Sequence, residues 1–196
     1  KKEYIGSSSG QDSAYIGTNL INGLLGTKVR IITGYKGSAG TTLSVEQGET
    51  FGMTNSWVSW NMSHAEWFKG QDNDFALKLA QVGFTKEPDL PNIPLLHEIA
   101  TTDDDRAAAA MLSTASVIGR GLAFPPQVPK NLIAPMRTAF WDTVNDADFK
   151  KDAKKRQIPV VPLKGADLQK TLVDAMKTMS PSAIAKAQSY VFGKKG

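Results

Sequence analysis

The chain of 196 residues contains no cysteine, and this absence excludes disulfide bonds and metal sites built from thiolates. Its only histidines, His64 and His97, are 33 positions apart and show no metal-ligand spacing. No apolar run approaches the roughly 18 residues that a membrane-spanning helix needs. Only one aromatic residue, Phe149, stands near the densest group of lysines, whereas nucleic-acid-binding patches usually interleave several. We therefore expect no metal, no other cofactor and no nucleic-acid partner.

The remaining composition is that of an ordinary globular protein. Hydrophobic residues make up 41% of the chain and charged residues 21%, and the formal net charge is +4. Basic residues are densest at residues 150–156, a stretch that we interpret as the solvent-exposed face of a helix. A chain of this length allows one domain or two small lobes.

The first half of the sequence alternates between strand-like and helical patterns. Short β-branched or alternating runs predict strands at residues 2–6, 28–34, 50–55 and 74–83. Helical spacing predicts helices that end near Leu25, at Gly48 and near Phe68. This order predicts an α/β lobe with a parallel-type sheet and crossover helices, which binds ligands beyond the carboxyl ends of its strands.

The second half has a different character. After a proline-rich stretch, residues 95–100 predict a short helix and residues 101–118 a longer one with an acidic first turn. Residues 119–129 predict a strand that runs into prolines. Most of the remainder is helical in pattern, with helices expected at residues 130–144, 146–156, 166–177 and 181–192.

The stretch "YIGSSSGQDS", residues 4–13, follows the first predicted strand and begins a helix. Its glycines allow a ligand close to the main chain, and its serines add hydroxyl donors to the free N–H groups of a helix start. This combination favours a bound carboxylate or phosphate, although a capped helix without any ligand explains it as well. The candidate ligand-binding residues here are Ser7, Ser8, Ser9, Gly10 and Ser13.

The same stretch also spells G-x-S-x-G, the pattern of a hydrolase nucleophile elbow centred on Ser8. Asp74 or Asp89 followed by His97 provides the required order of acid and base. However, only five residues precede Gly6, and neither histidine follows a clear strand. A serine hydrolase is therefore the alternative, and we expect no catalytic residue in this chain.

Two further loops repeat the pattern of donors at a helix start. The stretch "GYKGSAGTT" lacks the closing Gly-Lys-Ser/Thr of a phosphate-binding P-loop and the G-x-G-x-x-G dinucleotide fingerprint. In the stretch "MTNSW", an amide side chain precedes a helix-capping serine, and pure capping explains this pattern equally well. These loops add the candidate ligand-binding residues Tyr35, Lys36, Gly37, Ser38, Thr41, Asn55, Ser56 and Trp57.

Taken in order, several stretches resemble one family. The stretches "IGSSSGQDS" and "INGLLGTKVRIITGYKGSAGTTLSVEQGETFGMTNSW" resemble the second lobe of Bug-type periplasmic receptors, the solute-binding proteins of tripartite tricarboxylate transporters. The resemblance continues through "EPDLPNIPLLHEIA" and "GRGLAFPPQVPKNLIAPMRTAFWDTVNDADFKKDAKKRQIPV". It spans nearly the whole chain, and the order of these blocks is its specific signal.

The resemblance implies a periplasmic clamshell that binds a small carboxylate and delivers it to a membrane permease. It implies that residues 1–118 form the second ligand-binding lobe and that residues 119–196 are a return strand and closing helices of lobe one. In such receptors, the loops that match Ser7–Ser13 and Tyr35–Thr41 hold the ligand carboxylate. Phe51 and Asn55 stand where many members carry acidic residues, so the resemblance favours a plain acid as ligand.

The resemblance also implies that the N-terminal part of lobe one is absent from this chain. Apolar stripes in the C-terminal helices would then lack the sheet that they normally cover. We therefore expect the fragment to associate with another copy or to rearrange these helices, and to bind solute weakly. The stripes are formed by Leu132, Met136, Phe140, Leu168, Leu172, Met176, Ile184 and Val191.

Overall fold

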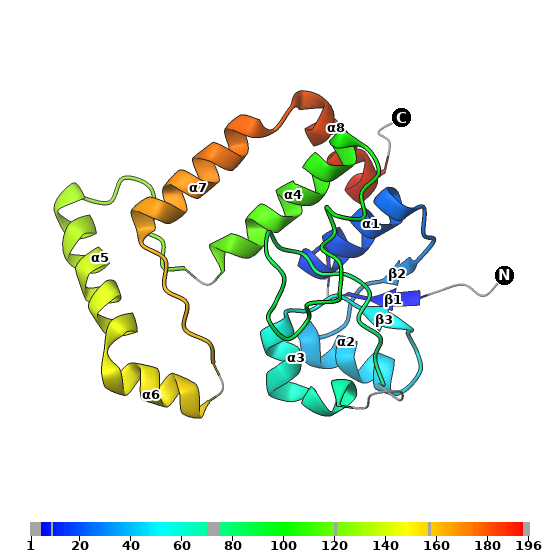
Figure 1. The fold of residues 1–196 in the computed structure, drawn as a ribbon, viewed down its shortest axis with the longest axis horizontal. Helices are drawn as coiled ribbons and strands as arrows, with labels where there is room; N and C mark the ends of the chain where they lie inside the picture. Colours follow the sequence, from blue (N-terminus) through cyan, green and yellow to red (C-terminus); the bar gives the residue numbers. More distant parts are fainter. Residues whose placement is uncertain (1–4, 9, 70–74, 120, 157, 194–196) are drawn as a thin grey trace.

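The computed structural model describes the chain except for residues 1–4, 9, 70–74, 120, 157 and 194–196 (Figure 1). The first half contains β1 (Ile5–Ser7), α1 (Ser13–Leu25), β2 (Arg30–Ile32), α2 (Gly37–Glu46), β3 (Gly52–Met53), α3 (Trp57–Ser63), and the 3-10 helix η1 (Ala65–Phe68). The second half contains α4 (Asp103–Ile118), α5 (Lys130–Asn145), α6 (Ala147–Lys155), α7 (Gly165–Thr178) and α8 (Pro181–Phe192).

The prediction of an α/β lobe of the periplasmic-binding-protein type is wrong. The protein is mostly helical, with 56% helix and 5% strand, so it lacks the substantial parallel sheet of such a lobe. Its three strands are two or three residues long and pair over that length only. A local β pattern becomes a strand only where a neighbouring backbone completes its hydrogen bonds, so three of the predicted stretches form short strands and the described residues of the other two form none.

The fourth predicted strand shows this most clearly. Of residues 74–83, only Gln81 takes part in β pairing in the described part of the chain, through one isolated bridge to Leu95. Leu77 and Leu79 are 81% and 79% exposed, so the alternating pattern does not place its leucines in a core. Residues 95–100 also form no helix, and the described residues of 119–129 form no strand.

The short strands that do form are parallel, in the order β2-β1-β3. Ser7 in the central strand β1 is aligned with Ile32 in β2 and with Met53 in β3. Because parallel strands run in one direction, the loops that follow β1, β2 and β3 leave the same edge, and each leads into a helix.

Helix α1 begins and ends at local capping residues. The Asp12 carboxylate accepts hydrogen bonds from the N–H groups of Ala14 and Tyr15, which caps the helix start. Gly26 ends the helix in the left-handed conformation, with φ of 63°, which glycine adopts without steric cost. Leu20 and Leu24, one turn apart, are buried on the inner face of α1.

The main hydrophobic core lies where α1, α4 and α8 pack together (Figure 1). Alanines on α4 and α8 allow the helices to approach closely, and leucines fill the space between them. A buried carboxylate adds a polar connection, because Asp105 accepts hydrogen bonds from Thr102 and Tyr190 and lies 2.9 Å from Lys186 Nζ. The buried members of this core are Leu20, Leu24, Leu96, Ala100, Ala108, Ala109, Ala187 and Val191.

Helices α5 and α6 have a different environment. They pack against each other, and Figure 1 shows the pair, in yellow, standing to one side of the main body. Among their described residues, only Val144 and Ala153 are buried. Helix α8 contacts α1 and α4, so the last helix shares the core of the first. The expected division at residue 118 stays a prediction.

Candidate functional site

The candidate residues come from three loops that share one edge of the short strands. The Ser8 N–H donates to the Ile32 carbonyl at 3.0 Å, which joins the first loop to the end of β2. The hydroxyls of Thr18 and Thr54 lie 3.3 Å apart and connect α1 to the third loop. The starts of α1, α2 and α3 therefore follow strands that end at the same edge, although their donors are used in different ways.

The first loop already holds a carboxylate, and it is the chain's own. The Ser8 hydroxyl is 1% exposed and lies 2.6 Å from the Gly10 carbonyl oxygen and 2.8 Å from Asp12 Oδ1, with both as acceptors. The same Asp12 oxygen accepts from two N–H groups at the start of α1. Asp12 thus occupies the donors that the sequence suggests for a ligand.

The other residues of the first loop contribute less. Ser7 lies within β1, and Ser13 is the exposed first residue of α1. The Gly10 N–H donates to the Ser8 hydroxyl at 3.3 Å, so the turn is closed on itself. Ser9 lies outside the described residues.

The second loop is arranged differently, because no side chain caps α2. Its N-cap residue, Lys36, makes no capping hydrogen bond, and Lys36, Gly37 and Ser38 are all exposed. The Gly37 N–H donates to the Tyr35 carbonyl at 3.0 Å. The next N–H groups of the first turn have no partner within the helix, and they belong to exposed residues. Gly37 has a φ of 62°, in the region that favours glycine.

Two candidate residues of the second loop face their own surroundings instead of a ligand. The Tyr35 hydroxyl donates to Glu49 at 2.7 Å, and this hydrogen bond raises the pKa of Tyr35. Thr41 is 4% exposed and donates to the Ser38 carbonyl at 2.9 Å, within α2. The Tyr35 hydroxyl is thus used by Glu49, and the Thr41 hydroxyl by carbonyl oxygens of the first turn of α2.

The third loop begins α3. The Ser56 hydroxyl accepts from the Ser59 N–H at 3.2 Å, so this serine caps the helix. Asn55 Oδ1 accepts from the Ser56 N–H at 2.9 Å, and the two N–H donors of the Asn55 amide remain for other partners. The Trp57 ring packs 5.1 Å from Phe68 and its indole N–H points at Asp89 Oδ2, 3.5 Å away.

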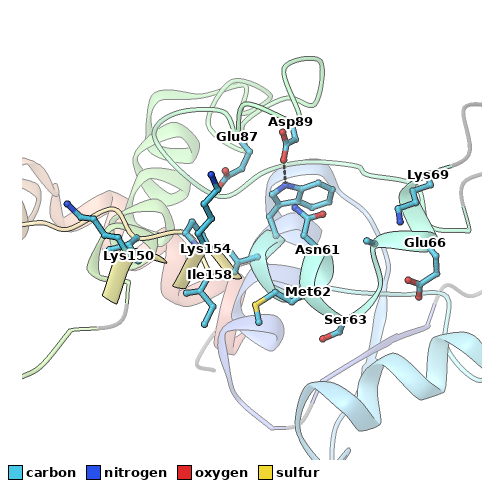
Figure 2. Close-up of a pocket in the computed structure, with 15 residues that line it drawn as sticks. Asn61, Met62, Ser63, Glu66, Lys69, Glu87, Asp89, Lys150, Lys154 and Ile158 are labelled. Atoms are coloured by element: carbon cyan, nitrogen blue, oxygen red, sulfur yellow. Dashed lines mark hydrogen bonds between the residues drawn. The ribbon is translucent and has the colours of Figure 1, made fainter. Parts of the chain in front are cut away.

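A separate cleft of about 980 Å³ lies beside α3 (Figure 2). One wall comes from α3, η1 and the loop at residues 87–89, and the other from α6 and residues 158–160. Of the predicted site residues, only Trp57 lines it. The lining residues are Trp57, Val58, Asn61, Met62, Ser63, Ala65, Glu66, Lys69, Glu87, Asp89, Lys150, Lys154, Ile158, Pro159 and Val160.

The two walls of this cleft carry different charges. Glu66, Glu87 and Asp89 belong to the first wall, together with the single cation Lys69, whereas the charges of the second wall are Lys150 and Lys154 (Figure 2). No local sequence pattern joins residues 57–69 to residues 150–160, so sequence reasoning missed the cleft. In the sequence, the lysine pairs within residues 150–155 indicated one wall of the cleft.

The described residues show how Ser8 and His64 are placed. No hydrogen bond there joins Ser8 to either histidine. His64 Nδ1 lies 3.6 Å from both Glu46 and Glu66, and its ring packs 4.8 Å from Trp67. The described part of the chain also shows no group of three or more acidic or histidine side chains that could hold a metal ion.

Comparisons with protein-family models, with curated proteins and with solved structures found no match to this chain. The similarity to the Bug-type receptors therefore rests on the sequence stretches alone. It stays a prediction, and the chain is assigned to no family.

Proposed function

We propose that this protein binds a small carboxylate reversibly at the start of α2. The observation that carries the proposal is the contrast between two helix starts that follow adjacent strands. At α1, serine and backbone donors surround the Asp12 carboxylate, whereas at α2 the corresponding donors are exposed and uncapped beside Lys36. The chemistry that holds a carboxylate internally at α1 is thus available to an external one at α2.

In this proposal, backbone N–H groups of Ser38 and the following residue bind the ligand carboxylate. The Ser38 hydroxyl adds a donor, and the Lys36 ammonium provides a charge-assisted hydrogen bond, which is among the stronger kinds. The amide of Asn55, at the same edge, is the next donor within the candidate set. Tyr35 and Thr41 act on Glu49 and on the α2 backbone, so they support the loop without binding the ligand.

We further propose that the protein is an extracytoplasmic receptor that delivers its ligand to a tripartite tricarboxylate-type permease. This part depends on the similarity of the sequence stretches to the receptor family. It also fits a site of convergent donors without a paired acid and base, because reversible capture requires no proton transfer. Carboxylate binding can be tested by itself and is therefore tested first.

The test is isothermal titration of the purified chain with acetate, succinate and citrate. We expect at least one carboxylate to bind, and Lys36→Ala to weaken that binding about tenfold, which corresponds to the loss of one charge-assisted bond. Ser13→Ala is the matched control, because it removes an exposed hydroxyl from the start of α1. Absence of binding by all three acids, or equal weakening by both variants, would contradict the proposal.

The hydrolase alternative has a direct test as well. Because the Ser8 hydroxyl is buried and hydrogen-bonded to Gly10 and Asp12, we expect no labelling by a serine-directed phosphonate. Covalent modification of Ser8, located by mass spectrometry, would favour the hydrolase and count against a pure binding site.

A further inference from the structure

We infer that the α5–α6 pair is a docking surface for an anionic lipid bilayer. The first observation is the distribution of charge. Residues 130–164 contain eight of the 23 basic residues and four of the 19 acidic residues. This stretch therefore carries the whole net charge of +4, and the rest of the chain is neutral. Its basic residues, all exposed, are Lys130, Arg137, Lys150, Lys151, Lys154, Lys155, Arg156 and Lys164.

The second observation is that, apart from the wall of the cleft beside α3, this region stands away from the main body (Figure 1). Helices α5 and α6 have their extensive contacts with each other, and Figure 1 shows them beside the core instead of within it. On α6, Lys150, Lys151, Lys154 and Lys155 lie at i, i+1, i+4 and i+5, which places them on one continuous side of the helix. Lys151 and Lys155 do not line the cleft that Lys150 and Lys154 face.

The third observation is that large apolar side chains are exposed in the same part of the chain. Leu132 and Met136 on α5 are each 46% exposed, and Val161, which follows α6, is 89% exposed. Exposed apolar groups together with lysines are typical of segments that lie in the interfacial region of a bilayer, where both kinds of group find partners. No helix among the described residues is long and apolar enough to span a membrane, so the inferred contact is peripheral.

The charge also distinguishes between the possible occupants of this surface. A second copy would present the same positive stretch, and like charges would oppose the contact. An acidic protein would satisfy the lysines, but it gives no specific reason for exposed apolar residues beside them. A bilayer with anionic headgroups satisfies both, because the headgroups attract lysine and the acyl boundary accepts the apolar side chains.

The test is co-sedimentation of the whole chain with vesicles at low ionic strength. We expect binding to phosphatidylcholine vesicles that contain about one third phosphatidylglycerol, and little binding to phosphatidylcholine alone. Raising the salt concentration should release the protein, since screening shortens the range of the attraction. Light scattering without vesicles, in the same buffer, reports self-association.

The decisive variant is Lys151→Glu/Lys155→Glu, which reverses two exposed charges on α6. We expect vesicle affinity to fall more than about 25-fold, given roughly fivefold per basic residue at an anionic surface. The matched control, Lys28→Glu/Lys177→Glu, makes the same charge change at exposed lysines outside residues 130–164 and should retain most of the affinity. Circular dichroism confirms that both variants fold.

Three results would overturn the inference. The first is absence of binding to anionic vesicles at low salt. The second is an equal loss of vesicle affinity in the two double variants, which would show that net charge alone determines the binding. The third is salt-sensitive dimerisation through α6 in the absence of lipid, which would make a second copy the occupant. Retention on immobilised polyglutamate without vesicle binding would instead identify an acidic protein as the partner.

Discussion

Two helical regions of this protein have similar amphipathic sequences and different environments. In the region formed by α1, α4 and α8, apolar stripes meet and exclude water, and Leu20 is only 2% exposed. In the α5–α6 region, the corresponding stripe residues Leu132 and Met136 are each 46% exposed. An apolar stripe therefore predicts a helix, whereas the burial of that stripe depends on whether another element packs against it.

The largest expected difference between the regions comes from removing a leucine from each. Leu20→Ala should lower the free energy of unfolding by about 2–5 kcal/mol, because it leaves a cavity in the core. Leu132→Ala should lower it by less than about 1 kcal/mol, because much of that side chain is already in water. Urea denaturation of both variants measures the difference, and equal losses would mean that α5 is packed as tightly as α1.

The next prediction concerns Asp105, the buried carboxylate of the first region. Burial alone would raise its pKa, but hydrogen bonds from Thr102, Lys186 and Tyr190 outweigh this and lower the pKa below its ordinary value. The folded state therefore gains stability from ionised Asp105 above the ordinary pKa of about 3.9, and loses it as the pH falls below that value. Chemical denaturation at pH 7 and at about pH 3 should show this loss.

Asp105→Asn supplies the matched variant for this prediction. It should reduce stability at pH 7 by about 1–3 kcal/mol, since a charge-assisted interaction with Lys186 is lost. It should also lose less stability than the original protein on acidification, because the titrating group is gone. If both proteins responded equally to acid, other carboxylates would be responsible for the pH dependence.

The smallest expected effect compares helix caps in the two regions. Asp12 caps α1, and Asp146 caps α6 through the Phe149 N–H at 2.8 Å. Asp12→Ala should lower global stability by about 0.5–2 kcal/mol, because α1 unfolds together with the core. Asp146→Ala should have a smaller effect on global unfolding, because α6 has few contacts that connect it to the rest.

Hydrogen exchange measures the local stability of the two regions separately. We expect amides of α6 to exchange faster in the Asp146→Ala variant while amides of α4 remain unchanged. The Asp12→Ala variant should instead accelerate exchange throughout α1, α4 and α8. Equal acceleration of both regions by either variant would show that they unfold as one unit.

The candidate site was predictable to a limited extent. Donor-rich loops at Ser8, Lys36 and Ser56 each precede a helix in the structure, as their residue types indicate. The sequence did not predict which of these donors already have a partner, because it does not show that Asp12 accepts from the donors of the first loop and that α2 has no cap. The cleft beside Trp57 was not predictable either, since its walls are about sixty to ninety residues apart in sequence.

The sequence determines most of the helices, because capping and apolar spacing act within a few residues. The last four helices form close to where their apolar spacing predicts them, whereas residues 95–100 have a helical pattern and form no helix. Only the tertiary structure decided the strands and the surroundings of each stripe. The described residues of 74–83 have a strand pattern but only the single bridge from Gln81 to Leu95, and α8 joins α1 while α5 stays largely exposed. Sheet hydrogen bonds and apolar burial both require a second segment, and its position is a property of the whole chain.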